Sequence, residues 1–177
     1  MNKINVVGTS GSGKSTFSRT LATKLGHPYI EMDAIFWKAN WQESSDAEFF
    51  SALENSLSQD TWVLDGNYNR TAEIKWADID QVIWIDYSFS RTVYQAVKRA
   101  FIRSVTKTEL WENTGNIETF TKSFFSRDSI IVWTLKTYKR NRVRYTEMLN
   151  DPRYRHIEFV RLTSPKMAKA YIDKLCM

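Results

Sequence analysis

Two kinds of hydrophobic pattern alternate along the 177-residue chain. Short runs of apolar and β-branched residues predict β-strands, whereas longer segments with an apolar residue every three or four positions predict α-helices. The predicted strands cover about residues 3–7, 29–32, 61–64, 81–85 and 156–162. Because helical segments lie between these strands, the pattern predicts an α/β fold with a parallel sheet and crossover helices.

Capping and helix-breaking residues set the ends of the predicted helices. These helices cover about residues 14–25, 46–58, 71–76, 88–104, 127–149 and 165–175. Ser44-Ser45-Asp46 and Ser164-Pro165 are typical helix starts, and Gly26-His27-Pro28 is a typical stop. Residues 33–44 look irregular and aromatic. Residues 105–125 have weak periodicity, so we expect a loop-rich insert there.

The composition is typical of one globular domain. Hydrophobic residues make up 42% of the chain and charged residues 25%, with no repeat and no Pro/Gly-rich linker. We therefore expect residues 1–177 to form a single domain. No apolar run approaches the roughly 18 residues of a membrane span. The chain begins almost directly with its first predicted strand and has a single cysteine, Cys176, so we expect a cytoplasmic protein.

The positive charge is concentrated in one part of the chain. The net charge is +5, but residues 91–155 carry 14 Lys or Arg and only 6 Asp or Glu. A local basic excess of this kind can bind nucleic acid, or it can gather arginines over the phosphates of a nucleotide. The charge alone leaves both interpretations open.

Residues 8–16, GTSGSGKST, fit the P-loop spacing G-x-x-x-x-G-K-[ST]. Such a loop wraps a polyphosphate by turning backbone N–H groups inward, and glycine permits the dihedral angles that this requires. Lys14 adds positive charge near the β- and γ-phosphates, and Ser15 offers a hydroxyl to Mg²⁺. The loop lies between a predicted strand and a predicted helix, as the motif requires, so a plain Gly/Ser turn is the weaker interpretation.

The P-loop therefore predicts a site for ATP and Mg²⁺. The helix that begins at the loop also points the positive end of its dipole at the bound anion. The residues expected to contact the nucleotide here are Gly8, Gly11, Ser12, Gly13, Lys14, Ser15 and Thr16.

Two carboxylates, Asp33 and Asp65, follow predicted strands. Ligands of parallel α/β sheets bind at the carboxyl ends of the strands, so both side chains should lie at the same edge as the P-loop. Phosphoryl transfer needs an acid to position Mg²⁺ and benefits from a carboxylate that faces the acceptor hydroxyl. We assign the metal role to Asp65 and the acceptor role, as a candidate base, to Asp33. Capping of a turn is the alternative for both, and Asp86 is a weaker candidate.

Arg99 and Arg103 are four residues apart, so they share one face of the helix that precedes the insert. Two guanidinium groups in that place could neutralise the charge that builds up on the γ-phosphate in the transition state. Arg140 and Arg144 repeat the spacing on the long helix after the insert. For both pairs, a solvated basic helix face is the alternative.

Other catalytic chemistries have no support in the sequence. His27 and His156 are isolated, and no cluster of His, Cys and carboxylate residues has the spacing of metal ligands. The G-x-S-x-G elbow of serine hydrolases is absent as well. We therefore expect neither zinc chemistry nor hydrolysis by a nucleophilic serine.

The P-loop, LDGNYNRT at 64–71 and Arg99-x-x-x-Arg103 together resemble the adenylate kinase-like P-loop kinases. Within that group, the chain is most similar to the bacterial adenylate kinase-related or DNA topology modulation proteins. The P-loop is generic, whereas other shared stretches are specific to this set. They are MDAIFW (32–37), WVLDGNY (62–68), ELW (109–111), SRDSII (126–131) and RLTSP (161–165).

The resemblance implies a P-loop NTPase three-layer sandwich with five parallel strands in the order 2-3-1-4-5 and a small helical lid at 104–126. It implies that Arg103 and neighbouring basic residues such as Arg140 lie over the ATP phosphates, and that the loop around Ser164 lies near the adenine. Residues 33–60 would form the acceptor-binding region. The residues expected to contact the acceptor are Asp33, Trp37, Asn67 and Arg70.

The sequence departs from that family in two places. Nucleoside monophosphate kinases have an arginine that holds the monophosphate, but residues 31–69 contain no arginine and only one base, Lys38. Ile117 stands in the lid where relatives would have an arginine. These residues do not indicate a nucleotide acceptor, and the aromatic side chains of residues 36–41 either stack on a ring or close a core.

We therefore expect a small-molecule kinase that transfers the γ-phosphate of ATP. Its expected catalytic residues are Lys14, Asp33, Arg99 and Arg103, and its expected Mg²⁺ ligands are Ser15 and Asp65. The alternatives are a nucleic-acid-associated ATPase, which would use the basic residues of 91–155 as a footprint, and a polynucleotide-end kinase. No helix-turn-helix, zinc-finger or RNA-binding signature supports nucleic-acid binding. The sequence does not identify the acceptor.

Overall fold

The computed structural model describes residues 1–111, 114–120 and 129–175. In these residues one sheet contains the strands β1 (Lys3–Gly8), β2 (Tyr29–Glu31), β3 (Trp62–Asp65), β4 (Gln81–Ile85) and β5 (Glu158–Leu162). Neighbouring strands are all parallel, and their order is β2-β3-β1-β4-β5. The predicted fold class and the strand order that the resemblance implied are therefore confirmed.

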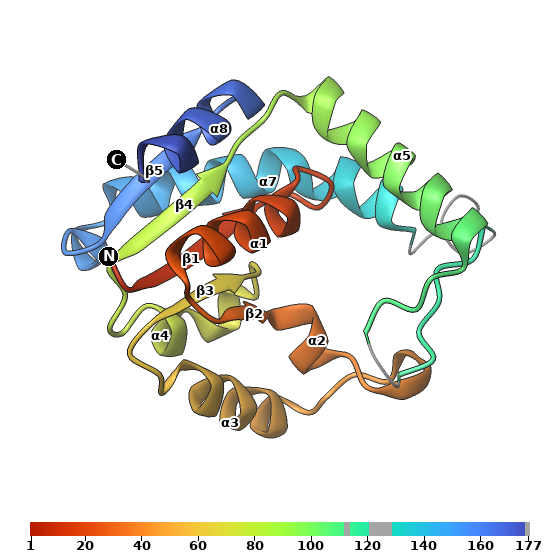
Figure 1. Ribbon diagram of the computed structural model, residues 1–177, viewed down its shortest axis with the longest axis horizontal. Helices are drawn as coiled ribbons and strands as arrows, with labels where there is room; N and C mark the ends of the chain where they lie inside the picture. Colours follow the sequence, from red (N-terminus) through yellow and green to blue (C-terminus); the bar gives the residue numbers. More distant parts are fainter. Residues whose placement is uncertain (112–113, 121–128, 176–177) are drawn as a thin grey trace.

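Helices cover both faces of the sheet, which gives three layers (Figure 1). One face packs against α1 (Lys14–Leu25) and α8 (Pro165–Lys174), and the other packs against α3 (Asp46–Leu57), α4 (Ala72–Lys75) and α7 (Ile130–Asn150). This division follows from the strands, because successive side chains point to opposite faces. In β4, Ile83 and Ile85 join the core under α1 and α8, whereas Val82 and Trp84 join the core under α7.

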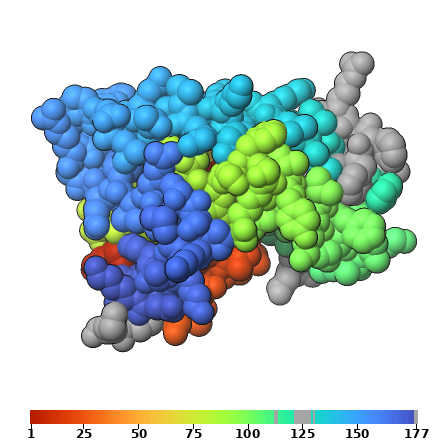
Figure 2. All heavy atoms as spheres, turned by 90° about the horizontal axis from the view of Figure 1, so that it is seen from above, coloured from red at the N-terminus to blue at the C-terminus, as the bar shows by residue number. Residues whose placement is uncertain are grey.

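Helix α5 (Phe89–Thr106) leads from β4 to the insert and packs along α7. The two helices lie side by side on the surface in Figure 2. The buried residues of α5 are the small Thr92, Ala96 and Ala100, which allow a close approach to the loop after β1. The helix therefore can carry side chains across to the P-loop.

The carboxyl ends of the strands meet at one edge of the sheet. Gly8, the last residue of β1, pairs in register with Ile85 of β4, and Glu31 of β2 pairs with Asp65 of β3. Asp65 also pairs with Val6 of β1. The P-loop and the strand-end carboxylate Asp65 are therefore neighbours, as the sequence predicted.

Predicted caps are observed at two helices. The Ser45 hydroxyl accepts a hydrogen bond from the Glu48 backbone N–H, and the Glu48 carboxylate accepts one from the Ser45 N–H, which is a capping box at α3. Ser164 caps α8 by accepting from the Met167 N–H. Ser88 occupies the N-cap position of α5, but its side chain makes no capping hydrogen bond.

The expectation of an irregular segment at 33–44 is wrong in part. Met32–Phe36 form the short helix α2, and Ala39–Trp41 form the 3-10 turn η1. Five residues are too few to show a helical hydrophobic period, so the sequence pattern carries no signal for α2. Packing fixes it instead, since the Phe36 ring is buried with centroids 5.2 Å from Phe49 and 5.1 Å from Tyr68.

Two more 3-10 turns, η2 (Asn69–Thr71) and η3 (Pro152–Tyr154), complete the described elements. The insert begins with the last turn of α5, and its residues 107–118, where described, contain no helix. The rest of the predicted helical lid, residues 121–126, lies outside the described residues. Among the helices that the structure describes, none combines the length and the apolar character needed to cross a bilayer.

Candidate active site

The P-loop connects β1 to α1 in a conformation that requires glycine. Gly11 and Gly13 have φ angles of 82° and 91°. A Cβ atom on Gly11 would lie only 2.7 Å from Ala96 Cβ and 2.9 Å from the Thr92 carbonyl oxygen in α5. Glycine is therefore needed at this position for space as well as for backbone conformation. The close approach of α5 fixes one side of the loop.

Some polar groups of the P-loop have no partner among the described residues, as expected of an anion-binding loop. No side chain caps α1, whose N-cap residue is Gly13, so the N–H groups of its first turn can bind an anion. The buried Ser12 hydroxyl has no hydrogen-bond partner among the described residues. Lys14 and Ser15 are half-buried at the start of the helix. A bound phosphate would recover the free energy that unpaired buried groups cost.

Asp65 fits the role of a Mg²⁺ ligand. It is buried at the end of β3 with 4% of its surface exposed. Its Oδ2 accepts a hydrogen bond of 3.0 Å from the Tyr29 hydroxyl, but its Oδ1 has no partner in the described part of the chain. A buried carboxylate oxygen without a partner is the kind of donor that Mg²⁺ binds. Mg²⁺ commonly takes one or two protein oxygens together with substrate phosphates, and Ser15 offers the second.

Asp33 lies in α2, beside the P-loop. Its Oδ1 accepts a hydrogen bond of 2.7 Å from the Tyr68 hydroxyl. Solvent reaches the side chain, yet the surrounding protein desolvates the carboxylate and so raises its pKa. The Tyr68 hydrogen bond and the charge of Lys14 oppose this rise in pKa, while the charges of Asp65 and Glu31 add to it. Asp33 is therefore within electrostatic reach of the P-loop lysine and of the candidate metal ligand.

Arg99 reaches the P-loop from α5. Its Nη2 donates a hydrogen bond of 3.0 Å to Ser10 Oγ, and its Nε is buried without a partner among the described residues. Burial lowers the pKa of Arg99, and the charge of Arg103 lowers it further. A guanidinium with an unused N–H beside a P-loop is suited to bind a phosphate. Arg99 is therefore not part of a solvated basic helix face, which was the alternative interpretation of this residue.

Arg103 lies one turn further along α5 and faces the insert. Its Nη1 pairs with Glu118 Oε1 at 2.8 Å, and the second oxygen of Glu118 is buried without a hydrogen-bond partner in the described residues. Glu118 also acts on Arg99, whose pKa it raises. The structure thus brings Arg99 and Arg103 together, with Arg99 on the P-loop and Arg103 on the insert.

Two residues predicted to bind nucleotide have other contacts. The Arg140 guanidinium lies 6.0 Å from the ring centroid of Trp133, which is 55% exposed. The Ser164 hydroxyl is used in capping α8. Within the described residues, neither side chain forms a hydrogen bond or ion pair with the P-loop. Their roles in nucleotide binding stay predictions.

Two residues predicted to contact the acceptor lie in an aromatic cluster. The Arg70 guanidinium stacks over the Phe36 ring at 5.1 Å, and its Nε pairs with Asp46 Oδ1 at 3.1 Å. The Trp37 ring meets those of Phe36 and Trp41 edge to face, at 5.1 and 5.7 Å. Both are thus engaged with neighbouring protein groups, and their roles toward an acceptor stay predictions.

Asn67, predicted to contact the acceptor, binds the P-loop backbone. Its Oδ1 accepts from the Gly8 N–H at 3.0 Å, and its Nδ2 donates to the Gly8 carbonyl at 2.7 Å. Tyr145 of α7 also donates to Oδ1, at 2.9 Å, and buried Lys75 donates to the Asn67 carbonyl, at 2.6 Å. Since both ends of the amide are used, these contacts give Asn67 a positioning role. Contact between Asn67 and the acceptor stays a prediction, which these hydrogen bonds do not support.

Sequence reasoning missed a group of partners around the carboxylates. The Glu31 carboxylate accepts from Trp111 Nε1 at 3.2 Å and pairs with Arg19 at 2.8 Å. The Tyr29 hydroxyl lies within hydrogen-bond distance of both Glu31 and Asp65, at 3.1 and 3.0 Å, and its single proton can be donated to either. Alternation along β2 was the available signal, because Tyr29 and Glu31 point to the same face. Nothing in the sequence pattern indicated the contact with Trp111.

The insert is held against the acceptor-binding region. The buried Asn116 side chain donates to the Lys38 carbonyl at 2.9 Å and accepts from the Trp41 N–H at 2.7 Å. The Thr114 carbonyl accepts from the Asn40 N–H at 3.2 Å. These bonds fix the described part of the insert on η1.

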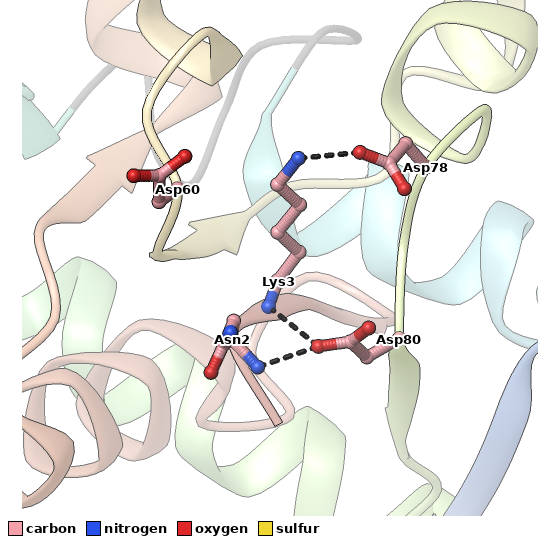
Figure 3. Close-up of a pocket in the computed structure, with 5 residues that line it drawn as sticks. All are labelled: Asn2, Lys3, Asp60, Asp78 and Asp80. Carbon is pink, nitrogen blue, oxygen red and sulfur yellow. Dashed lines mark hydrogen bonds and ion pairs between the residues drawn. The ribbon is translucent and has the colours of Figure 1, made fainter.

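A separate depression lies at the opposite, amino ends of the strands (Figure 3). There Lys3 Nζ pairs with Asp78 at 2.5 Å, and Asp80 accepts from the backbone N–H groups of Asn2 and Lys3. Asp60 stands apart from these three contacts in Figure 3. The acidic groups therefore tie the first strand to the start of β4, and we assign them no binding role.

Comparison with solved structures finds the same fold in two kinases and in an uncharacterized protein. A gluconokinase from Sinorhizobium meliloti 1021 has a TM-score of 0.50 at 19% identity, covering 99% of this chain and 93% of its own. A shikimate kinase from Acinetobacter baumannii in complex with shikimate has a TM-score of 0.58 at 15% identity, covering 99% and 90%. An uncharacterized protein from Eubacterium ventriosum ATCC 27560 has a TM-score of 0.53 at 14% identity, covering 99% of this chain and 98% of its own.

These similarities establish that the chain has the fold of the P-loop kinases. At identities below 20% they show the fold and not the reaction. A search of protein-family models finds no match. A search of curated proteins finds no significant match either.

Proposed function

We propose that this protein is an ATP-dependent kinase that transfers the γ-phosphoryl group of ATP to a hydroxyl of a small molecule. One observation carries the proposal: cationic side chains and a carboxylate lie together beside the P-loop, and each suits a different part of phosphoryl transfer. Arg99 binds Ser10 of the loop, while Asp33 lies within reach of the charge of Lys14. Cations suit the phosphates, and a carboxylate suits the acceptor hydroxyl.

On the nucleotide side, the N–H groups of the P-loop and Lys14 bind the β- and γ-phosphates. Ser15 and Asp65 would hold Mg²⁺, which supplies charge neutralisation across the phosphates when it is bound. The unpaired Ser12 Oγ and Asp65 Oδ1 support this assignment, because both are buried atoms without a partner in the described residues. Arg99 adds its unused Nε.

In the transfer step, the acceptor oxygen bonds to the γ-phosphorus while the bond from that phosphorus to the bridging oxygen of ADP breaks. Asp33 takes the proton of the acceptor hydroxyl, and Tyr68 holds the carboxylate in place through its hydrogen bond. The raised pKa suits this task, because it makes Asp33 a stronger base than an ordinary aspartate. Arg99 and Arg103 stabilise the charge on the moving group.

The comparisons support a small-molecule acceptor. A gluconokinase and a shikimate kinase share the fold over nearly the whole chain. The resemblance to the adenylate kinase-related proteins supports ATP as the phosphoryl donor. We place the reaction in the cytoplasm, as the sequence predicts.

A nucleic-acid-associated ATPase or a polynucleotide-end kinase would need exposed, unpaired cations from residues 91–155. Several of these cations are paired within the protein. Arg103 pairs with Glu118, Arg142 with Asp86 and Arg153 with Asp151, and Arg99 binds the P-loop. These four cations thus serve the site and the fold, whereas Lys98, Lys136 and Lys139 are exposed, so the DNA arm of the screen below tests this alternative.

An ATP-consumption screen tests the proposed function. The candidate acceptors are polyols, nucleosides, amino alcohols, nucleotides and small acids, with DNA as a parallel arm and the Lys14→Ala protein as the blank. The expected result is turnover that a small hydroxyl compound stimulates and that Lys14→Ala abolishes. Stimulation by DNA alone, persisting at about 200 mM salt, would contradict it, since purely electrostatic association weakens steeply there.

A further inference from the structure

Around Asp33, on the side of α2, η1 and the insert, Arg19, Lys38 and Arg70 are each paired with a carboxylate, whereas Lys14 and Arg99 lie at the P-loop and serve the nucleotide. We propose that the acceptor is a hydroxyl compound without an anionic group. Polyols, nucleosides and amino alcohols belong to this class, whereas sugar acids and nucleoside monophosphates do not. The inference rests on the proposed kinase function and narrows its substrate. It draws on the residues that surround Asp33 on the side of α2, η1 and the insert.

Contacts connect these residues into one region. Tyr68 binds Asp33, and Glu31 is close enough to raise the pKa of Asp33. Trp111 of the insert donates to Glu31, and its ring lies 6.0 Å from that of Trp41 in η1. An acceptor whose hydroxyl reaches Asp33 therefore meets the two carboxylates and the rings beside them.

The cations of this region are already engaged. Arg19 pairs with Glu31 at 2.8 Å and lies 5.1 Å from the Tyr29 ring. Lys38 Nζ bonds to both oxygens of Glu48 at 2.8 Å. An anionic group on an acceptor would have to break one of these ion pairs before it could form an ion pair of its own.

Arg70 is held by more than one kind of contact. Its ion pair with Asp46 is exposed and would be weak alone. However, its guanidinium also lies over the rings of Phe36, Phe49 and Tyr68, at 5.1, 5.6 and 5.9 Å. Planar stacking of this kind keeps an arginine in place. Arg70 thus supports the aromatic cluster and is not aimed freely at a ligand.

Apart from Lys14 of the P-loop, which lowers the pKa of Asp33, the charges that shift this pKa are negative. Besides Asp33 itself, Glu31 and Asp65 both raise the pKa of Asp33, and Glu43 raises that of Tyr68. With Mg²⁺ bound, Asp65 would be neutralised on the nucleotide side, but Glu31 and Asp33 would still face the acceptor. Like charges at short range oppose binding, so an acceptor carboxylate or phosphate is disfavoured here.

The aromatic residues offer surfaces that an uncharged or cationic ligand can use. Trp37, Trp41 and Trp111 form a chain of edge-to-face contacts at 5.7 and 6.0 Å. Asn40 and Trp41 both have positive φ angles, 58° and 61°, a costly conformation for residues other than glycine. Aromatic faces bind the C–H groups of sugars, the rings of bases, and cations.

Matched pairs of acceptors test the inference. Each pair differs by one anionic group: sorbitol against gluconate, and adenosine against AMP, within a wider panel of polyols, amino alcohols and sugar acids. The measurement is kcat/KM for phosphoryl transfer at saturating Mg·ATP, with Lys14→Ala as the blank. The expected result is that every acceptor used lacks an anionic group, and that it exceeds its anionic counterpart at least tenfold.

The possible failures are distinguishable. Equal or better transfer to the anionic member of a pair would overturn the inference while leaving the kinase function intact. No transfer to any compound in the panel, with Lys14-dependent ATP hydrolysis still present, would overturn the kinase function and the inference with it.

A charge variant adds an independent test. Glu31→Gln removes one negative charge and releases Arg19, so it should raise kcat/KM for the anionic member of a pair relative to the uncharged one by several-fold. Glu54→Gln, on the exposed surface of α3, is the matched control and should leave the ratio unchanged. An unchanged ratio in Glu31→Gln would overturn the electrostatic basis of the inference.

Discussion

The side-chain amide of Asn67 forms two hydrogen bonds with the backbone of Gly8: Oδ1 accepts from the Gly8 N–H at 3.0 Å, and Nδ2 donates to the Gly8 carbonyl at 2.7 Å. Asn67 thereby extends the pairing of β1 beyond the end of β3. Lys75 of α4 and Tyr145 of α7 in turn hold Asn67. The start of the P-loop is therefore braced from the face of the sheet opposite α1.

Asn67→Ala should weaken nucleotide binding. The substitution leaves the Gly8 N–H unpaired near the loop, at a cost of about 1–3 kcal/mol. We expect KM for ATP to rise about tenfold with a smaller change in kcat. Steady-state kinetics measure this, with Asn69→Ala, an exposed residue two positions away, as the control. Equal effects of the two variants would show that Asn67 does not position the loop.

Asp33→Asn should slow phosphoryl transfer and change its dependence on pH. Loss of a general base typically costs about 10²–10⁴-fold in rate. Because the pKa of Asp33 is raised, the wild-type rate should fall with acidification at a higher pH than an ordinary aspartate would give. The variant should lack that acidic limb in a pH–rate profile. A variant that keeps the limb would assign it to another group.

The same substitution should stabilise the free protein. A carboxylate whose pKa is raised by folding binds its proton more tightly in the folded state, so its charged form opposes folding at neutral pH. Thermal unfolding at pH 7 should therefore show a higher midpoint for Asp33→Asn than for wild type. The difference should shrink as the pH falls through the folded-state pKa. Asp60→Asn, on the exposed surface, should show no such difference.

Lys75 provides a test in the alkaline range. Burial lowers its pKa to about 7, so between that pH and its unfolded pKa the unfolded chain binds a proton that the folded chain does not. Stability from this group must rise with pH across that window. In urea unfolding experiments, the free energy of unfolding of the wild-type protein should rise between pH 7.5 and 9.5. Lys75→Met should lack about 2 kcal/mol of that increase. Identical slopes in the two proteins would contradict a buried, neutralising lysine.

Gly11→Ala tests the contact between the P-loop and α5. The added methyl group would lie 2.7 Å from Ala96 Cβ at a positive φ, so the cost should be about 3 kcal/mol of unfolding free energy. Gly26 also has a positive φ, 67°, but a Cβ there meets no atom within 4 Å. Gly26→Ala should therefore cost only about 1 kcal/mol. Equal costs would mean that the loop can move away from α5.

Local patterns were sufficient for most of the fold. The β-branched run before Gly8, the cap at Ser45 and the start at Ser164-Pro165 are short-range signals, and the corresponding strand and helices form where they predict. Helix α2 gave no such signal, because packing of Phe36 on Phe49 fixes it. Strand order came from a family resemblance, since no local pattern encodes which strands become neighbours.

The candidate site also combines residues that local sequence predicts with contacts that only the tertiary structure shows. The residues of the P-loop and the strand-end Asp65 follow from spacing and position alone. Partners that join distant segments, such as Tyr68 with Asp33 or Trp111 with Glu31, depend on tertiary placement that one sequence does not encode locally. For the same reason, the sequence did not predict that the amide of Asn67 binds Gly8, and its contact with the acceptor stays a prediction.

Direct detection of the phosphorylated product tests the central claim. The measurement is mass spectrometry of the acceptor after incubation with Mg·ATP, together with the amount of ADP formed. We expect one phosphorylated hydroxyl product per ADP with the wild-type protein and none with Lys14→Ala. ADP and inorganic phosphate in equal amounts, with no phosphorylated acceptor from any compound tested, would contradict it.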